Sequence, residues 1–62
     1  MPVPNYAAGE RILLSMAKRY RIAVEIADGC YFVTEPLVAI HRCETLHAAL
    51  NRLGSVQMER LV

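Results

Sequence analysis

The chain has little of the chemistry that marks secreted or membrane-bound proteins. Its 62 residues include no tryptophan and one phenylalanine. The chain has two cysteines, and two are too few for a disulfide framework. The first residues show neither the basic nor the apolar segment of a secretory signal, and no apolar run approaches the roughly 20 residues that span a bilayer. We therefore expect a cytoplasmic protein with reduced thiols and no membrane partner.

Charge of one sign is also scarce. Seven basic and six acidic residues leave a formal net charge of +1, which creates no strong field for attracting polyanions. The glycine-rich phosphate loop, the nucleophile elbow of serine hydrolases and the zinc-binding helix of metalloproteases are all missing from the sequence. These absences favour a protein that is not an enzyme and holds no cofactor.

Hydrophobic residues, in contrast, make up 55% of the chain. A domain this short hides only about 60% of the surface that its unfolded chain exposes, so part of this apolar surface has to stay accessible. Surface of that kind is often shared with another chain, most simply a second copy. We expect residues 1–62 to form a single domain that associates as a homodimer.

Apolar residues recur at helical spacing between Tyr6 and Tyr20, which predicts a first helix with Asn5 as its N-cap. Gly9 lowers helix propensity by about 1 kcal/mol relative to alanine, so its presence indicates close approach of another backbone. The core-facing stripe of this helix contains Leu13, Met16, Ala17 and Tyr20.

An alternating pattern follows and predicts a β-hairpin. Ile22–Ile26 alternates large apolar with smaller or charged residues, Asp28-Gly29 suits a type I′ turn, and Cys30–Glu35 supplies the second strand. A two-residue turn fixes the register so that Ala27 opposes Cys30 and Val24 opposes Val33. The face assigned to the core carries Ile22, Val24, Ile26, Tyr31 and Val33. The opposite face carries Ala23, Glu25, Phe32 and Thr34.

The rest of the chain predicts a third strand and a second helix. Leu37–Arg42 reads as a strand, and Thr45 is a suitable N-cap for a helix that ends at Gly54. Residues 55–62 fit either a short helix or a strand. The predicted fold is a two-layer α+β domain, a three-stranded antiparallel sheet with an N-terminal and a C-terminal helix (αβββα) that cover one sheet face.

Two thiol sites are conceivable. Zinc prefers four nitrogen or sulfur ligands in a tetrahedron, and a weak candidate set is Cys30, His41, Cys43 and His47. Cys43 is also a candidate nucleophile, because two histidines flank it in sequence and Glu44 could orient one of them. The spacing lacks a Cys-x2-Cys knuckle, so two small buried thiols and two partly exposed histidines are the favoured interpretation.

A nucleic-acid-binding regulator is the alternative function. Its contacts would come from a basic stripe around the first helix, formed by Arg11, Lys18, Arg19 and Arg21. The strand order and the segment from Cys43 to Leu50 are similar to small AP2-type DNA-binding sheets. The arginine- and tryptophan-rich sheet face of that family is missing here.

The function that we favour from the sequence is a non-enzymatic protein-interaction or regulatory module. Phe32 is a large apolar residue on the uncovered sheet face, where a polar residue is usual. Other apolar residues exceed what two helices and one sheet can hide. The predicted interface residues are Phe32, Ile12, Leu14, Leu37, Met58 and Leu61, and the predicted partner is a second copy, with another protein as a further possibility.

Overall fold

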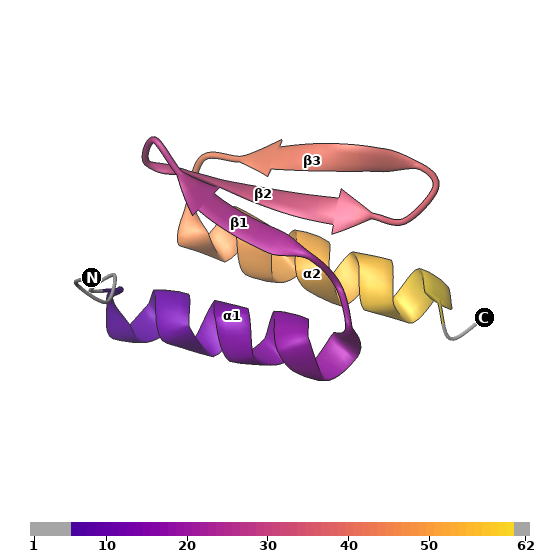
Figure 1. The fold of residues 1–62 in the computed structure, drawn as a ribbon, viewed down its shortest axis with the longest axis horizontal. Helices are drawn as coiled ribbons and strands as arrows, with labels where there is room; N and C mark the ends of the chain where they lie inside the picture. The colour runs from indigo at the N-terminus through magenta and orange to yellow at the C-terminus, as the bar shows by residue number, and fades with distance from the viewer. Residues whose placement is uncertain (1–5, 61–62) are drawn as a thin grey trace, which may run out of the picture.

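The structure is a computed structural model that describes residues 6–60. Its elements follow the order α1 (Ala8–Tyr20), β1 (Val24–Ala27), β2 (Cys30–Glu35), β3 (Ala39–Cys43) and α2 (Leu46–Arg60). The three strands form one antiparallel sheet in the order β1-β2-β3. Both helices lie on the same side of this sheet (Figure 1), so the predicted αβββα fold is confirmed.

The ends of α1 are set by local hydrogen bonds. Its N-cap is Ala7, whose backbone N–H donates to Glu10 Oε1 at 3.1 Å. The predicted N-cap, Asn5, lies outside the described residues, and the helix begins later than predicted. Arg21 ends the helix in the left-handed conformation, with a φ of 58°, and its N–H bonds back to the last turn.

The hairpin between β1 and β2 has the predicted register. Asp28 and Gly29 have φ values of 52° and 73°, and positive φ at both central residues is what a type I′ turn requires. Val24 pairs with Val33, and Ala27 pairs with Cys30. Because side chains alternate along a strand, this register places Val33 toward the helices and Phe32 on the other face.

Strand β3 begins at Ala39, two residues later than predicted. Leu37 adopts a left-handed conformation with a φ of 66°, and the N–H of Val38 donates to the carbonyl of Glu35 at 3.1 Å. These features make a turn of residues that the sequence pattern assigns to a strand. Glu35 therefore pairs with Ala39, and this pair sets which face each β3 side chain occupies.

Helix α2 does not end at Gly54, as the sequence predicts, but continues to Arg60. The predicted N-cap is supported, since Ala48 N–H donates to Thr45 Oγ1 at 3.1 Å. Beyond Gly54, Val56 extends the buried stripe and is only 1% exposed. Burial of this side chain outweighs the roughly 1 kcal/mol that an internal glycine costs. Residues 55–60 are thus helical, and residues 61–62 lie outside the described part.

The core lies between the helices and one sheet face. Its buried members are Leu13, Ala17, Ile22, Val33, Cys43, Ala49, Leu53 and Val56. Val24 and Tyr31 pack against this cluster as predicted, whereas Ile26 is half-buried outside it. Gly9 does make room for a close neighbour, but this neighbour is the side chain of Leu46 and not a backbone segment.

Candidate interaction surface

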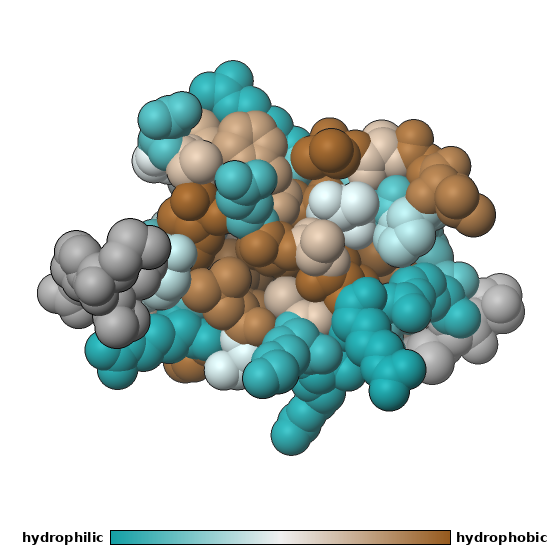
Figure 2. Space-filling view, in the orientation of Figure 1, coloured by the Kyte–Doolittle hydropathy of each residue, from teal (hydrophilic) through white to brown (hydrophobic). Residues whose placement is uncertain are grey.

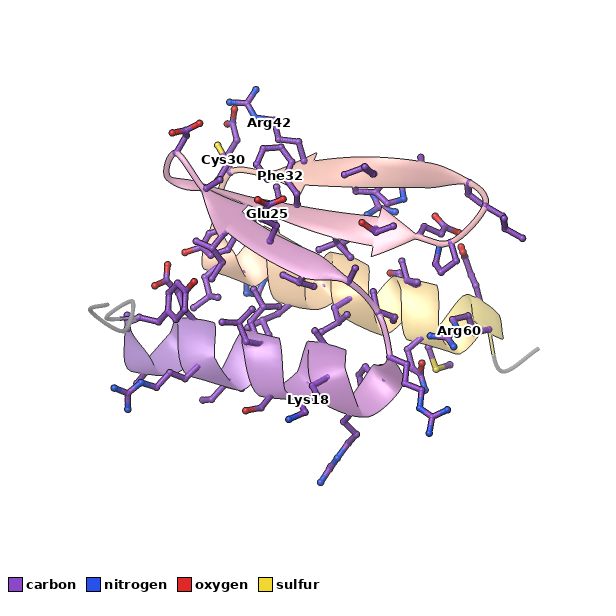
Figure 3. All side chains as sticks on the ribbon, in the orientation of Figure 1. Lys18, Glu25, Cys30, Phe32, Arg42 and Arg60 are labelled. Carbon is purple, nitrogen blue, oxygen red and sulfur yellow. The ribbon has the colours of Figure 1, made fainter. Side chains whose placement is uncertain are left out.

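The face of the sheet that points away from both helices carries rows of side chains that run across the strands. The middle row contains Glu25 on β1, Phe32 on β2 and Arg42 on β3, which are successive pairing partners. Figure 3 shows these three side chains projecting from the sheet on the side opposite the helices. We call this surface the open face, because no element of residues 6–60 covers it.

A second row of the open face lies toward the end of β2. The N–H of Thr34 donates to the carbonyl of Ala23 at 2.9 Å, and Thr34 pairs with Ile40 on β3. Ile40 is 67% exposed and lines the same surface hollow as Phe32 and Thr34. The row thus carries a small residue at one edge and a large residue at the other.

A third row lies beside the type I′ turn and contains Ala27 and Cys30. Arg42 reaches toward this row, and its Nη2 donates to Cys30 Sγ at 3.4 Å. The same guanidinium lies 4.0 Å from Glu44 Oε1. These contacts hold the arginine side chain on the open face, beside Phe32.

The predicted interface residues differ in exposure. Exposed fractions are 57% for Ile12, 107% for Leu37 and 66% for Met58. Leu14 and Phe32 are half-buried, and Leu61 lies outside the described residues. The exposed three belong to α1, the β2–β3 turn and α2, so Phe32 is the predicted residue that lies within the open face.

Ile40 and Arg42 are members of the open face that sequence reasoning did not select. The prediction assigned Leu37–Arg42 to a strand, without saying which of its side chains point away from the helices. The length of the β2–β3 turn determines the sheet face on which Ile40 and Arg42 lie. Pairing of Glu35 with Ala39 fixes the face of Ala39, and later side chains of β3 alternate from there. The sequence pattern does not indicate the length of this turn, because the positive φ of Leu37 is rare for a residue with a bulky side chain.

The four candidate zinc ligands do not come together. His41 and Cys43 share the sheet face that points toward the helices. Cys30 lies on the opposite face, because side chains alternate along β2 and Cys30 is two residues from Phe32. His47 is an exposed residue of α2. Among residues 6–60, no group of three or more histidine, cysteine or acidic side chains could hold a metal ion.

The candidate nucleophile also lacks its base in the described residues. Cys43 is buried, and its Sγ lies 4.0 Å from the backbone carbonyl of His41. The imidazole of His41 instead contacts the Glu35 carboxylate, with 2.7 Å between Nε2 and Oε1. Cys43 does line a groove of about 700 Å³ along β3, but no thiol–imidazole hydrogen bond forms there within residues 6–60.

An acidic cluster near the end of α2 was not predicted. The hydrogen bond with His41, followed by that with Glu59, lowers the pKa of Glu35. Hydrogen bonding to Glu35 and repulsion from its charge raise the pKa of Glu59. Two carboxylates in contact favour one shared proton. The sequence carries no signal for this cluster, because its members come from β2, β3 and α2.

The predicted basic stripe is exposed. Arg11, Lys18, Arg19 and Arg21 all lie at the surface, and none of them forms an ion pair within residues 6–60. In Figure 3, Lys18 lies on the side of α1 that points away from the sheet. Figure 2, in the same orientation, shows hydrophilic side chains along the lower edge of the molecule and hydrophobic side chains across the middle of the view.

Comparisons with protein-family models, curated proteins and solved structures gave no match to this chain. What the fold itself defines is a class of protein, the small two-layer α+β domain with one sheet face uncovered in the described residues. Neither of the helices described, α1 or α2, has the length and apolar character that a membrane span requires.

Proposed function

We propose that the chain is a non-enzymatic protein-interaction module that acts as a homodimer through the open face. The observation that carries this proposal is the pair of large apolar side chains, Phe32 and Ile40, on a sheet face that no described element covers. An antiparallel sheet commonly exposes one face to water, but that face is then polar.

Energetics favour covering this face. Burial of apolar surface contributes about 25 cal/mol per Å², and Ile40 leaves 67% of its surface in water. The neighbours Ala23 and Ala27 add no charge to the patch. Both described helices lie on the other side of the sheet, and the covering element that we propose is the open face of a second copy.

The first experiment is sedimentation equilibrium of the wild type and of Ile40→Glu at high micromolar concentration. We expect a dimer for the wild type and a monomer for the variant, because a carboxylate would be buried at the interface. Ile12→Glu is the matched control, as it makes the same change at an exposed site on α1 and should remain dimeric.

Two results would contradict the proposal. A monomeric wild type at these concentrations removes the homodimer altogether. Dissociation of Ile12→Glu with an intact Ile40→Glu dimer moves the interface from the sheet to α1, where Ile12 is itself a predicted interface residue. Circular dichroism of each variant distinguishes dissociation from unfolding.

A nucleic-acid-binding regulator is the second candidate, and it rests on the unpaired basic stripe of α1. Four exposed cations without acidic partners in residues 6–60 could contact phosphates, although basic residues at a helix C-terminus also serve the helix dipole. A gel shift with duplex and single-stranded DNA over a salt series tests this function. We expect weaker binding for Lys18→Glu if the stripe binds nucleic acid, and absence of salt-sensitive binding by the wild type rejects it.

A further inference from the structure

We infer that two copies of this chain pack open face to open face around a twofold axis that runs parallel to the strands, above β2. The inference rests on the proposed homodimer and adds its geometry. It comes from the order of charges and side-chain sizes across the rows of the open face.

Such an axis has a simple effect on the strands. It places β1 of one copy opposite β3 of the other, and it places β2 opposite β2. Aligned packing of two sheets, about 10 Å apart, is a common arrangement in β-sandwiches. An interface of this kind is isologous, so every contact occurs twice or lies on the axis.

When this twofold axis brings the middle row of one copy opposite the middle row of the other, opposite charges face each other. It reads Glu25, Phe32, Arg42 across the sheet, so Glu25 of each copy faces Arg42 of the other. Phe32 lies at the centre and faces its own counterpart. The two ion pairs flank an aromatic contact, and their long side chains can bridge the gap between the sheets.

In the row that contains Ile40, the same axis places a large side chain opposite a small one. It reads Ala23, Thr34, Ile40, so the exposed side chain of Ile40 faces the small Ala23 of the other copy. Large residues opposite small ones are what interdigitating sheet faces require. The same axis therefore satisfies two rows that differ in chemistry.

A twofold axis perpendicular to the strands gives the opposite result. Such an axis places β1 opposite β1 and β3 opposite β3. When it passes above the middle row, Glu25 would face Glu25 and Arg42 would face Arg42. Like charges in direct opposition disfavour an interface strongly. For axes centred on the middle row, the charges thus favour the axis that runs parallel to the strands.

Charge reversal tests this geometry. Glu25→Arg alone and Arg42→Glu alone each place like charges opposite one another, and we expect each to weaken dimerisation by about a hundredfold. An equimolar mixture of the two single variants restores both opposite-charge pairs and should give a heterodimer. The double variant E25R/R42E should recover the homodimer. Lys18→Glu matches the charge change of Arg42→Glu at an exposed site on α1 and should leave the dimer intact.

The outcomes separate this inference from the proposed function. If the wild type is a dimer and both single variants also remain dimers, the pairing is wrong but the homodimer stands. If both single variants are folded monomers that the mixture and the double variant fail to rescue, the open face is needed but the axis is wrong. A wild type that is monomeric overturns the inference together with the proposed function.

Discussion

The two faces of the sheet have opposite environments although they share the same three strands. On β2, Val33 points toward the helices and is fully buried, whereas its neighbour Phe32 remains partly accessible on the open face. The difference follows from the placement of both helices on one side. The layer of helices completes one core and leaves the second sheet face uncovered in residues 6–60.

The polar groups differ between the faces as well. At the rim of the covered face they are paired within the domain, as in the 2.7 Å hydrogen bond from Tyr31 Oη to Glu10 Oε2. On the open face, Glu25 has no ion-pair partner in residues 6–60. The covered face is thus satisfied by its own chain, whereas the open face retains both apolar surface and an unpaired charge.

The largest expected effect comes from removing a core side chain. Leu53 is 0% exposed, so Leu53→Ala should lower the free energy of unfolding by about 2–5 kcal/mol, out of roughly 3–9 kcal/mol for a domain of this length. Urea unfolding at two protein concentrations checks this prediction. We expect the same loss at both concentrations, because the residue stabilises the domain itself.

Phe32→Ala is the comparison on the open face. Its stabilising contacts should come largely from the second copy, so its effect should be small in dilute solution and grow with protein concentration. An equally large loss in dilute solution would place Phe32 in the core of the single domain. The distinction between the two faces would then fail.

The parts of this fold that the sequence predicts are those that local chemistry determines. Asp28-Gly29 specifies its turn and with it the whole β1–β2 register, and Thr45 marks the start of α2. The end of α2 could not be predicted in this way. The glycine signal at Gly54 is local, but burial of Val56 depends on packing against the rest of the domain.

The candidate surface was predictable only in part, for a related reason. Phe32 follows directly from the hairpin register, but its neighbours Ile40 and Arg42 depend on the next turn. That turn places Leu37 at positive φ, which side-chain composition does not indicate. The contact between Glu35 and Glu59 joins segments far apart in sequence, and no periodic pattern could have found it.

A smaller effect compares two glycines that both lie within helices. Gly54 has open space where a Cβ would be, so Gly54→Ala should stabilise the domain by about 0.5–1 kcal/mol. At Gly9 the added carbon meets the side chain of Leu46. Overpacking of about 1–3 kcal/mol then offsets the gain in helix propensity, and Gly9→Ala should be neutral or destabilised. Thermal unfolding of the two variants side by side checks the difference, and equal stabilisation would mean that Leu46 moves aside freely.

The smallest expected effect concerns the acidic cluster at the rim of the covered face. Glu35 raises the pKa of Glu59, so the folded state holds this proton more tightly than the unfolded chain does. Glu59 therefore favours folding at low pH, and this contribution is lost as the pH rises through the raised pKa. The pKa of Glu35 is lowered, chiefly by the hydrogen bond with His41, so its contribution is present at neutral pH and is lost in acid.

Glu59→Gln separates these two opposing contributions. The variant removes the repulsion between the carboxylates and should unfold at a higher temperature than the wild type at pH 7. The difference should shrink as the pH falls through the raised pKa of Glu59, because the protonated wild-type side chain, like glutamine, carries no charge. A difference that is constant across this pH range would show that the substitution acts through packing and not through the shared proton. Because the cluster lies on the covered side, neither result should change the association of two copies through the open face.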